Sequence, residues 1–189
     1  MRDADATRRR ILDAGTEEFA RHGIAGSRVD RIAAASRSNK AQLYHYFGGK
    51  EALFDAVFAD HVAANVGTVP LTADDLPGYA VRLHDAYLAD PALVRLLSWV
   101  RLERRPTGEL FADVPGHDLP AIATLTRAQE QGSLVDDVEA TDLWSMLLAL
   151  CGTWAQASIT TAGHERDPRA VLDRRREALR RTVARAFCR

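Results

Sequence analysis

Apolar residues recur at intervals of three and four residues along most of the chain, which is the spacing of amphipathic helices. In residues 7–22, Ile11, Gly15 and Phe19 lie four residues apart on one stripe. Gly23 follows directly, and glycine is the residue that most often stops a helix. The pattern therefore predicts a first helix over about 7–22.

Between residues 27 and 54 the apolar pattern is broken into short segments. Ser27 and Asp30 have the spacing of a capping box, so a short helix is expected to open at Ser27. After a turn at 36–38, Asn39 is suited to cap a second short helix, which Gly48 and Gly49 would end. The inward positions would be Val29, Ile32 and Ala33 of the first helix and Leu43, Tyr46 and Phe47 of the second. Two short helices joined by a tight turn, with another helix behind, are the layout of a helix-turn-helix.

The remaining residues also carry helical spacing, with few signals for strands. Helices are predicted over about 50–66, 72–89, 118–131 and 139–161, and from Asp90 and Asp167 onward, where each aspartate precedes a proline. Thr72 and Asp75 form a second predicted capping box, and 105–117 is the longest irregular stretch. Since alanine, leucine and arginine dominate and long β-branched runs are missing, the predicted fold class is all-α.

One segment, 143–162, runs for twenty residues without a charge and has to be weighed as a membrane span. Its hydroxyl and amide side chains are too many for a lone span, so a helix buried on several sides is favoured and no membrane partner is expected. Within it, Ala149, Gly152 and Ala155 would let another helix approach closely.

The net charge of -1 argues against a uniformly basic protein, but the charge is unevenly distributed. Residues 1–50 hold 10 Lys or Arg and 6 Asp or Glu, whereas residues 51–189 hold 15 and 20. The only two lysines, Lys40 and Lys50, both lie in the first part. We therefore predict a cationic N-terminal domain over 1–50, with its motif at about 28–47, and an acidic second domain over 51–189.

Two cysteines, Cys151 and Cys188, are too few for a disulfide framework in a chain of 189 residues, which favours a reducing compartment. The first residues lack the apolar core of a signal peptide. The expected location is the cytoplasm.

The outward side of the second short helix carries the groups that could read DNA. Asn39, Ala41 and Gln42 lie in its first turn, where a recognition helix meets base edges, and glutamine can pair bidentately with adenine. Donors suited to phosphate oxygens surround them. These are Lys40, Tyr44, His45 and Lys50, together with Ser27 and Arg28 at the start of the preceding helix.

On these residues the chain resembles the DNA-binding domain of the TetR family of bacterial transcription regulators, over roughly residues 7–62. The similarity runs through Lys40, Leu43, Tyr44, Tyr46, Phe47, Lys50, Glu51, Leu53 and Phe54. There are two departures: Arg37 stands where the family has a turn glycine, and Ser38 where it has an apolar residue. The backbone of the turn could therefore differ, and Arg37 could add a phosphate contact.

The resemblance implies an N-terminal three-helix DNA-binding domain joined to a C-terminal helical domain that binds a ligand and forms a dimer through its last two long helices. An effector that is mostly apolar or aromatic is expected, and the interpretation as plain core residues stays open for each aromatic candidate. The candidates are His84, Tyr87, Trp99, Phe111, Trp154 and Gln156, of which His84 and Gln156 would supply polar contacts.

The function expected from these features is a homodimeric, ligand-responsive transcription regulator, a repressor that binds a palindromic operator. The alternative is a helical interaction protein of the same fold that has lost DNA binding, motivated by Arg37 and Ser38. An enzyme is not expected, because the sequence lacks HExxH, CxxC, GxSxG and phosphate-loop motifs and its histidines are scattered. For the same reason neither a metal site nor a cofactor is predicted.

Overall fold

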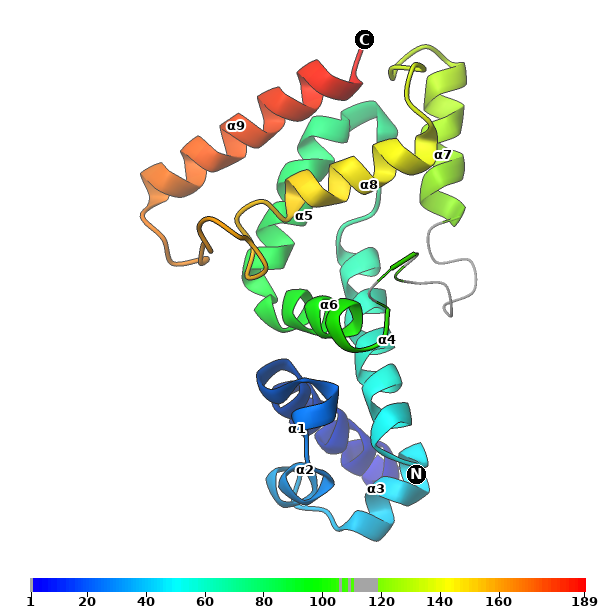
Figure 1. The fold of residues 1–189 in the computed structure, drawn as a ribbon, viewed down its shortest axis with the longest axis vertical. Helices are drawn as coiled ribbons and strands as arrows, with labels where there is room; N and C mark the ends of the chain where they lie inside the picture. The colour runs from blue at the N-terminus through cyan, green and yellow to red at the C-terminus, as the bar shows by residue number, and fades with distance from the viewer. Residues whose placement is uncertain (1, 106, 109, 111–118) are drawn as a thin grey trace. The chain divides into compact units, whose positions relative to one another are not determined.

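The computed structural model describes residues 2–105, 107, 108, 110 and 119–189, and these form helices joined by turns (Figure 1). The elements are α1 (Arg2–Gly26), α2 (Val29–Ala35), α3 (Lys40–Phe47), α4 (Lys50–Thr68), the 3-10 helix η1 (Ala73–Asp75), α5 (Leu76–Ala89), α6 (Pro91–Glu103), α7 (Leu119–Glu130), α8 (Ala140–Cys151) and α9 (Arg169–Phe187). Among the described residues the only β-type pairing is a single bridge between Leu134 and Cys188. The predicted all-α class is confirmed.

The chain divides into two compact units. The first comprises residues 1–64 and 92–110, so it includes α1 to α3, most of α4 and most of α6. The second comprises residues 65–91 and 111–189. The grouping of α6 with the first helices has no signal in the local sequence, because it rests on contacts between residues about eighty positions apart. The division into functional domains at residue 50 stays a prediction.

The core of the first unit is built on the stripes that the periodicity marks. Phe19 of α1 and Phe54 of α4 are fully buried and meet edge to face, with ring centroids 5.2 Å apart. Leu43 is the fully buried residue of α3. Gly15 allows the close approach of α1 and α4, because a Cβ there would lie only 3.2 Å from a methyl carbon of Val57.

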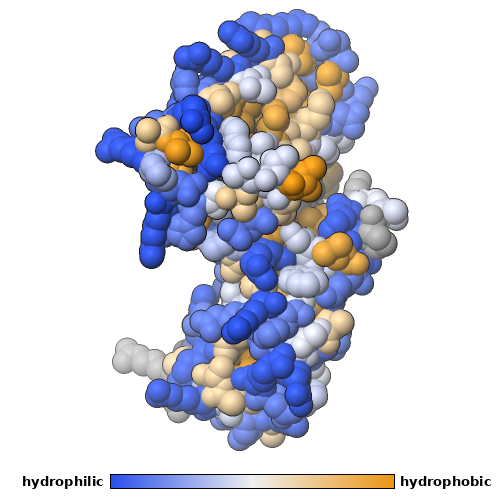
Figure 2. Space-filling model, turned by 60° about the vertical axis from the view of Figure 1, so that its left-hand side comes forward, coloured by the Kyte–Doolittle hydropathy of each residue, from blue (hydrophilic) through white to orange (hydrophobic). Residues whose placement is uncertain are grey.

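In the second unit, α5 is the central element and packs against α8 and α9, while α7 packs against α8. Leu76 and Leu83 of α5, Leu147 of α8 and Val183 of α9 are all nearly or fully buried in one cluster. Figure 2 shows apolar residues exposed between hydrophilic ones on one face of the molecule. No helix in the described part of the chain has both the length and the apolar character needed to cross a bilayer.

Several helix boundaries agree with the prediction. Gly23 breaks α1 with a φ of 72°, Gly48 ends α3 with a φ of 79°, and Gly132 follows α7 with a φ of 75°. α6 begins at Pro91, as the Asp-Pro pair indicates. Positive φ at these positions explains why glycine ends the helices.

Three local predictions are wrong. Ser27 does not cap α2, because Arg28 is the N-cap residue and the Ser27 hydroxyl bonds elsewhere. Thr72 does not cap α5 either. Asp75 does so, with its carboxylate accepting from Gly78 N at 2.9 Å, while the Thr72 hydroxyl accepts from Arg82.

The third concerns the uncharged helix, which ends at Cys151 and not near residue 161. Successive tight turns follow, with Ala155 N bonded to Gly152 O and Ser158 N bonded to Ala155 O, each at 3.0 Å. Glycine and the hydroxyl residues of this stretch favour turns over helix interiors, which accounts for the early end. Ala155 is buried inside its own unit, so it is not available to a partner helix as predicted.

Candidate nucleic-acid interface

The turn between α2 and α3 keeps a left-handed residue although it has no glycine. Arg37 has a φ of 52°, the only positive φ at a non-glycine residue among those described. Its N–H bonds to Ala34 O at 3.2 Å and the next N–H, of Ser38, bonds to Ala33 O at 2.9 Å, which closes the end of α2. The side chain of Arg37 is exposed. Arginine here takes the backbone conformation for which glycine is the usual residue.

Two serines stabilise the same turn. The buried Ser36 hydroxyl lies 2.8 Å from Ile32 O and 2.7 Å from the Ser38 hydroxyl. Arg10 of α1, which the sequence pattern does not single out, donates from Nε to Ser36 O at 3.3 Å. Ser38 therefore replaces an apolar contact by a hydrogen bond, and the departure from the family pattern at this position is accommodated without loss of the turn.

α3 begins with the predicted cap in a reciprocal form. The Asn39 side chain accepts from Gln42 N at 2.8 Å, and the Gln42 side-chain oxygen accepts from Asn39 N at 3.2 Å. Two N–H groups that the helix leaves unbonded are thus satisfied. The capping role of Gln42 is additional to the predicted base contact.

The outer face of α3 is exposed along its length. Leu43 alone is fully buried, whereas Tyr44 is 51% exposed. Lys40 pairs across the turn with Asp30 of α2 at 2.6 Å, and this hydrogen bond lowers the pKa of Asp30. The exposed face, which we call the α3 outer face, consists of Asn39, Lys40, Ala41, Gln42, Tyr44 and His45. The predicted base-reading and phosphate-binding side chains of α3 therefore share one solvent-facing surface.

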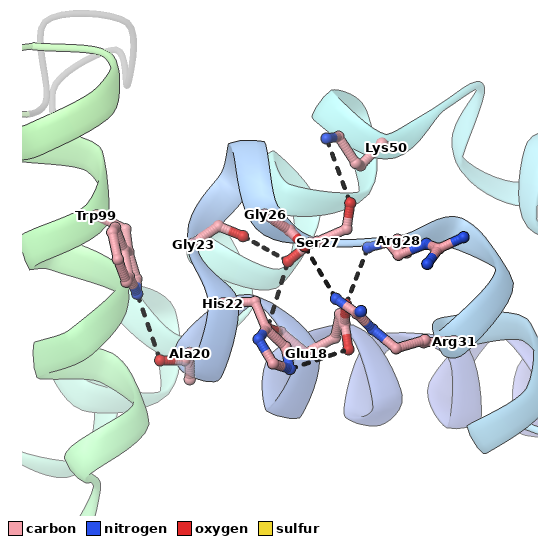
Figure 3. A network of polar contacts seen from close by, with 10 residues as sticks. All are labelled: Glu18, Ala20, His22, Gly23, Gly26, Ser27, Arg28, Arg31, Lys50 and Trp99. Carbon is pink, nitrogen blue, oxygen red and sulfur yellow. Dashed lines mark hydrogen bonds and ion pairs between the residues drawn. The ribbon is translucent and has the colours of Figure 1, made fainter.

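Ser27 and Lys50 are held in contacts within the protein. Ser27 is only 5% exposed, and its hydroxyl donates to the carbonyl oxygens of Gly23 and, at 3.3 Å, Glu18 (Figure 3). The ammonium group of Lys50 lies 3.4 Å from Ser27 O and 3.5 Å from Ala25 O. The Ser27 hydroxyl is thus not on the surface. Lys50 holds the segment that leads into α2 through its contacts with the backbone carbonyls of Ala25 and Ser27.

Glu18 joins α1 to the start of α2. Its carboxylate accepts from Arg28 N at 2.9 Å and from the Arg31 guanidinium at 2.6 Å, and its side chain is nearly buried (Figure 3). Burial acts to raise the pKa of Glu18, but the hydrogen bonds from Arg31 and Arg28 N outweigh it and the pKa is lowered. Sequence analysis misses Glu18, because its partners lie ten and thirteen residues away and no motif links them.

α6 completes this unit at the break in α1. Gly23 breaks α1, and just before the break Trp99 Nε1 donates to Ala20 O at 3.3 Å (Figure 3). Glu103 accepts from Ala25 N at 2.7 Å. A Cβ at Gly23 would lie 2.9 Å from the Trp99 ring, so packing as well as φ favours glycine there.

Two family models match the chain. Residues 11–57 match bacterial regulatory proteins, tetR family, and residues 75–185, more than half of the chain, match the tetracyclin repressor-like, C-terminal domain. The chain belongs to the TetR family of bacterial regulatory proteins. The first match contains the turn at Arg37 and the whole α3 outer face, so the resemblance drawn from the sequence is confirmed.

Individual relatives support the same assignment to the TetR family. The chain is similar to the HTH-type transcriptional repressor SCO4008 of Streptomyces coelicolor, with 38% identity over 97% of this chain and 98% of that protein. The HTH-type transcriptional repressor NicS of Pseudomonas putida is 31% identical, covering 78% of this chain and 75% of its own length. The crystal structure of SCO4942 from Streptomyces coelicolor superposes with a TM-score of 0.78 at 37% identity, over 96% of this chain and 98% of that one.

In the TetR-family C-terminal region, the structure brings together some of the predicted effector residues. His84 of α5 and Trp154, after α8, meet edge to face with ring centroids 5.6 Å apart. Tyr87 lies one turn further along α5 and is half-buried. Gln156 is exposed in the turns that replace the predicted end of the helix.

Two predicted effector residues do not join this group. Trp99 belongs to the first compact unit, where it bonds to Ala20 and packs on Gly23, whereas His84 and Trp154 belong to the second, and its effector role stays a prediction. Phe111 lies outside the residues that the structure describes. In that described part of the chain, no group of three or more His, Cys, Asp or Glu side chains is placed to hold a metal ion.

Proposed function

We propose that this TetR-family protein is a transcription repressor that binds a palindromic operator as a homodimer and is released by a small effector. The single observation that carries the DNA-binding part is the α3 outer face, presented after a turn whose left-handed residue is retained by Arg37. A recognition helix needs this geometry to enter the major groove with its first turn toward the bases. Two relatives are named transcriptional repressors, which supports repression over activation.

Within this proposal the α3 outer face divides by chemistry. Ala41 and Gln42 contact base edges, while Lys40, Tyr44 and His45 contact the backbone. Arg28 and Arg37 are exposed on the flanks of α2 and add phosphate contacts. Ser27 and Lys50 act indirectly, since their polar groups hold the start of α2.

The alternative is a helical interaction protein of the same fold without specific DNA binding. Its basis is the presence of Arg37 and Ser38 in the turn, and the hydrogen bonds that the turn keeps weaken that basis. A gel-shift titration with the DNA upstream of the protein's own gene distinguishes the two functions. We expect specific binding that survives competitor DNA, and binding no tighter than to unrelated DNA would support the alternative.

Matched cation variants sharpen this experiment. Arg28→Ala should weaken binding to all DNA sequences. It should also reduce the slope of the logarithm of the binding constant against the logarithm of the salt concentration by about 1, as expected for a lost phosphate contact. Arg166→Ala removes the same charge from an exposed position in the second unit and should leave the operator affinity unchanged. Equal effects of the two variants would mean that net charge, and not the α2–α3 surface, determines DNA binding.

A further inference from the structure

His84 is a buried polar residue with one unsatisfied atom. It lies on α5, is 1% exposed, and its Nδ1 is 3.0 Å from Cys151 O at the end of α8. Its Nε2 is also buried, and no hydrogen-bond partner for it is found among the described residues. Because buried polar atoms nearly always have partners, this nitrogen calls for a group that the described residues do not supply.

The contact with Cys151 determines which kind of group is needed. A carbonyl oxygen can only accept, so Nδ1 must carry the ring proton. Burial has the largest effect and lowers the pKa of His84. The Cys151 carbonyl and Asp85 act to raise that pKa, Arg175 and Arg176 act to lower it, and the net direction is downward. The ring is therefore neutral near pH 7, and Nε2 presents a lone pair that can only accept.

The surroundings of His84 are aromatic, and the nearby cation Arg175 is paired with a carboxylate. Its ring meets the edge of Trp154 at 75° between planes, and the guanidinium of Arg175 lies 5.7 Å from the centre of the Trp154 ring. Arg175 is already paired with Asp167 at 2.8 Å. An anionic ligand is thus not required to balance charge here, and an aromatic one suits the aromatic surroundings that Trp154 gives His84.

Resting on the proposed ligand-responsive function, we propose that His84 selects the effector: its Nε2 accepts a hydrogen bond from a hydroxyl or N–H group on an otherwise aromatic molecule. A phenol or an indole satisfies Nε2, whereas a methyl ether, a ketone or a carboxylate presents no donor and leaves it unpaired. The selectivity of the regulator for donor-bearing aromatic compounds then follows from the tautomer that Cys151 imposes.

The test uses aromatic compounds in matched pairs that differ only by methylation of the donor: phenol with anisole, naphthol with its methyl ether, and indole with N-methylindole. Binding to the full-length protein is measured by calorimetry. At least one donor compound should bind, and its methylated partner should bind about tenfold more weakly, because a polar site rejects a ligand that leaves its acceptor unpaired.

Two variants assign the effect to His84. His84→Asn keeps a donor toward Cys151 O but places no acceptor at the Nε2 position, so the donor and methylated compounds should bind with nearly equal affinity. His164→Asn makes the same change at an exposed histidine of the α8–α9 connection and should keep the full ratio. NMR of the histidine side-chain nitrogens in the unmodified protein, which does not depend on the folding of a variant, should show the His84 proton on Nδ1.

The inference is overturned if no compound of the panel binds, if methylation does not change affinity, if His84→Asn retains the preference, or if the proton is found on Nε2. If a single ordered water occupies Nε2, methylation of the ligand will not change its affinity, since the ligand would then not touch the imidazole. Failure of the proposed function is distinguishable, because it appears as absence of operator binding in the ligand-free protein.

Discussion

At the scale of single residues, Arg37 shows what a sequence pattern can and cannot settle. The missing glycine is visible in the sequence and raises the question of whether the turn is kept. The answer depends on a backbone energy that the sequence does not display: the left-handed conformation costs a non-glycine residue roughly 1–2 kcal/mol. The hydrogen bonds of Ser36 and Ser38 and the contact from Arg10 offset that cost.

We therefore predict that Arg37→Gly is more stable than Arg37→Ala by roughly 0.5–1 kcal/mol in urea unfolding. Both variants lose the guanidinium, so the difference between them reports the backbone alone. At a position with negative φ the order would be reversed, because alanine restricts the unfolded chain more than glycine does. A more stable alanine variant would contradict the left-handed turn.

Gln42 combines a cap and a proposed base contact, and two substitutions separate these roles. Gln42→Glu keeps an acceptor for Asn39 N and should retain the unfolding free energy, whereas Gln42→Ala should lose about 1 kcal/mol. Both should lose preference for adenine at one operator position, at a cost of roughly 1–3 kcal/mol, and glutamate should gain preference for cytosine there. Binding is titrated against single-base operator variants, and an unchanged preference profile would exclude base reading by Gln42.

At the scale of helices and turns, periodicity and glycine positions predict most of the fold, while side-chain partners remain hidden. The break in α1 at Gly23 and the end of α3 at Gly48 both occur where local chemistry predicts them. Ser27 has the spacing of a capping box, yet its hydroxyl donates to Gly23 O at the break in α1 and Arg28 takes the N-cap position. The same type of competition ends α8 at Cys151, where turn-forming residues outweigh the apolar pattern.

The corner between α1 and α2 should be sensitive to acid through Glu18. Its pKa is lowered in the folded state, so its contribution to stability is complete above the unfolded value of about 4.3 and is lost as the pH falls through the lower folded value. Glu18→Gln should lower the unfolding free energy near pH 7 and flatten its acid decline. Urea titrations between neutral and acidic pH measure both effects.

Glu17→Gln is the matched control for that experiment, since it makes the same change at the neighbouring exposed position of α1. It should leave both the neutral-pH stability and the acid decline unchanged. An identical pH profile in the two variants would mean that the bonds from Arg28 and Arg31 do not stabilise the folded corner.

At the scale of the whole molecule, sequence patterns relate residues that are close in the chain and do not show which distant residues pack together. The candidate effector residues rest on such local patterns. Trp99 and Trp154 look alike as aromatic residues in apolar helical segments, but Trp99 belongs to the unit that contains α1. Which unit a helix joins depends on long-range contacts, such as those of α6 with Ala20 and Ala25, that no local pattern encodes. The two-part layout is indicated by the uneven charge along the chain and by the family resemblance, and two family models match the two parts.

The proposed dimer can be tested on α8, where Met146 is 42% exposed and Ala149 lies on the same helical face. Met146→Arg places an unpaired charge in the proposed subunit interface, which costs several kcal/mol, so sedimentation should show a monomer. Leu102→Arg, the same type of change at an exposed residue of α6, should stay dimeric. Because palindromic half-sites lie about 34 Å apart and are bound together only by a dimer, the Met146 variant should also lose operator affinity and become indifferent to half-site spacing. A dimer that survives Met146→Arg would place the interface on another surface and leave the DNA-binding proposal to be decided by the operator titration alone.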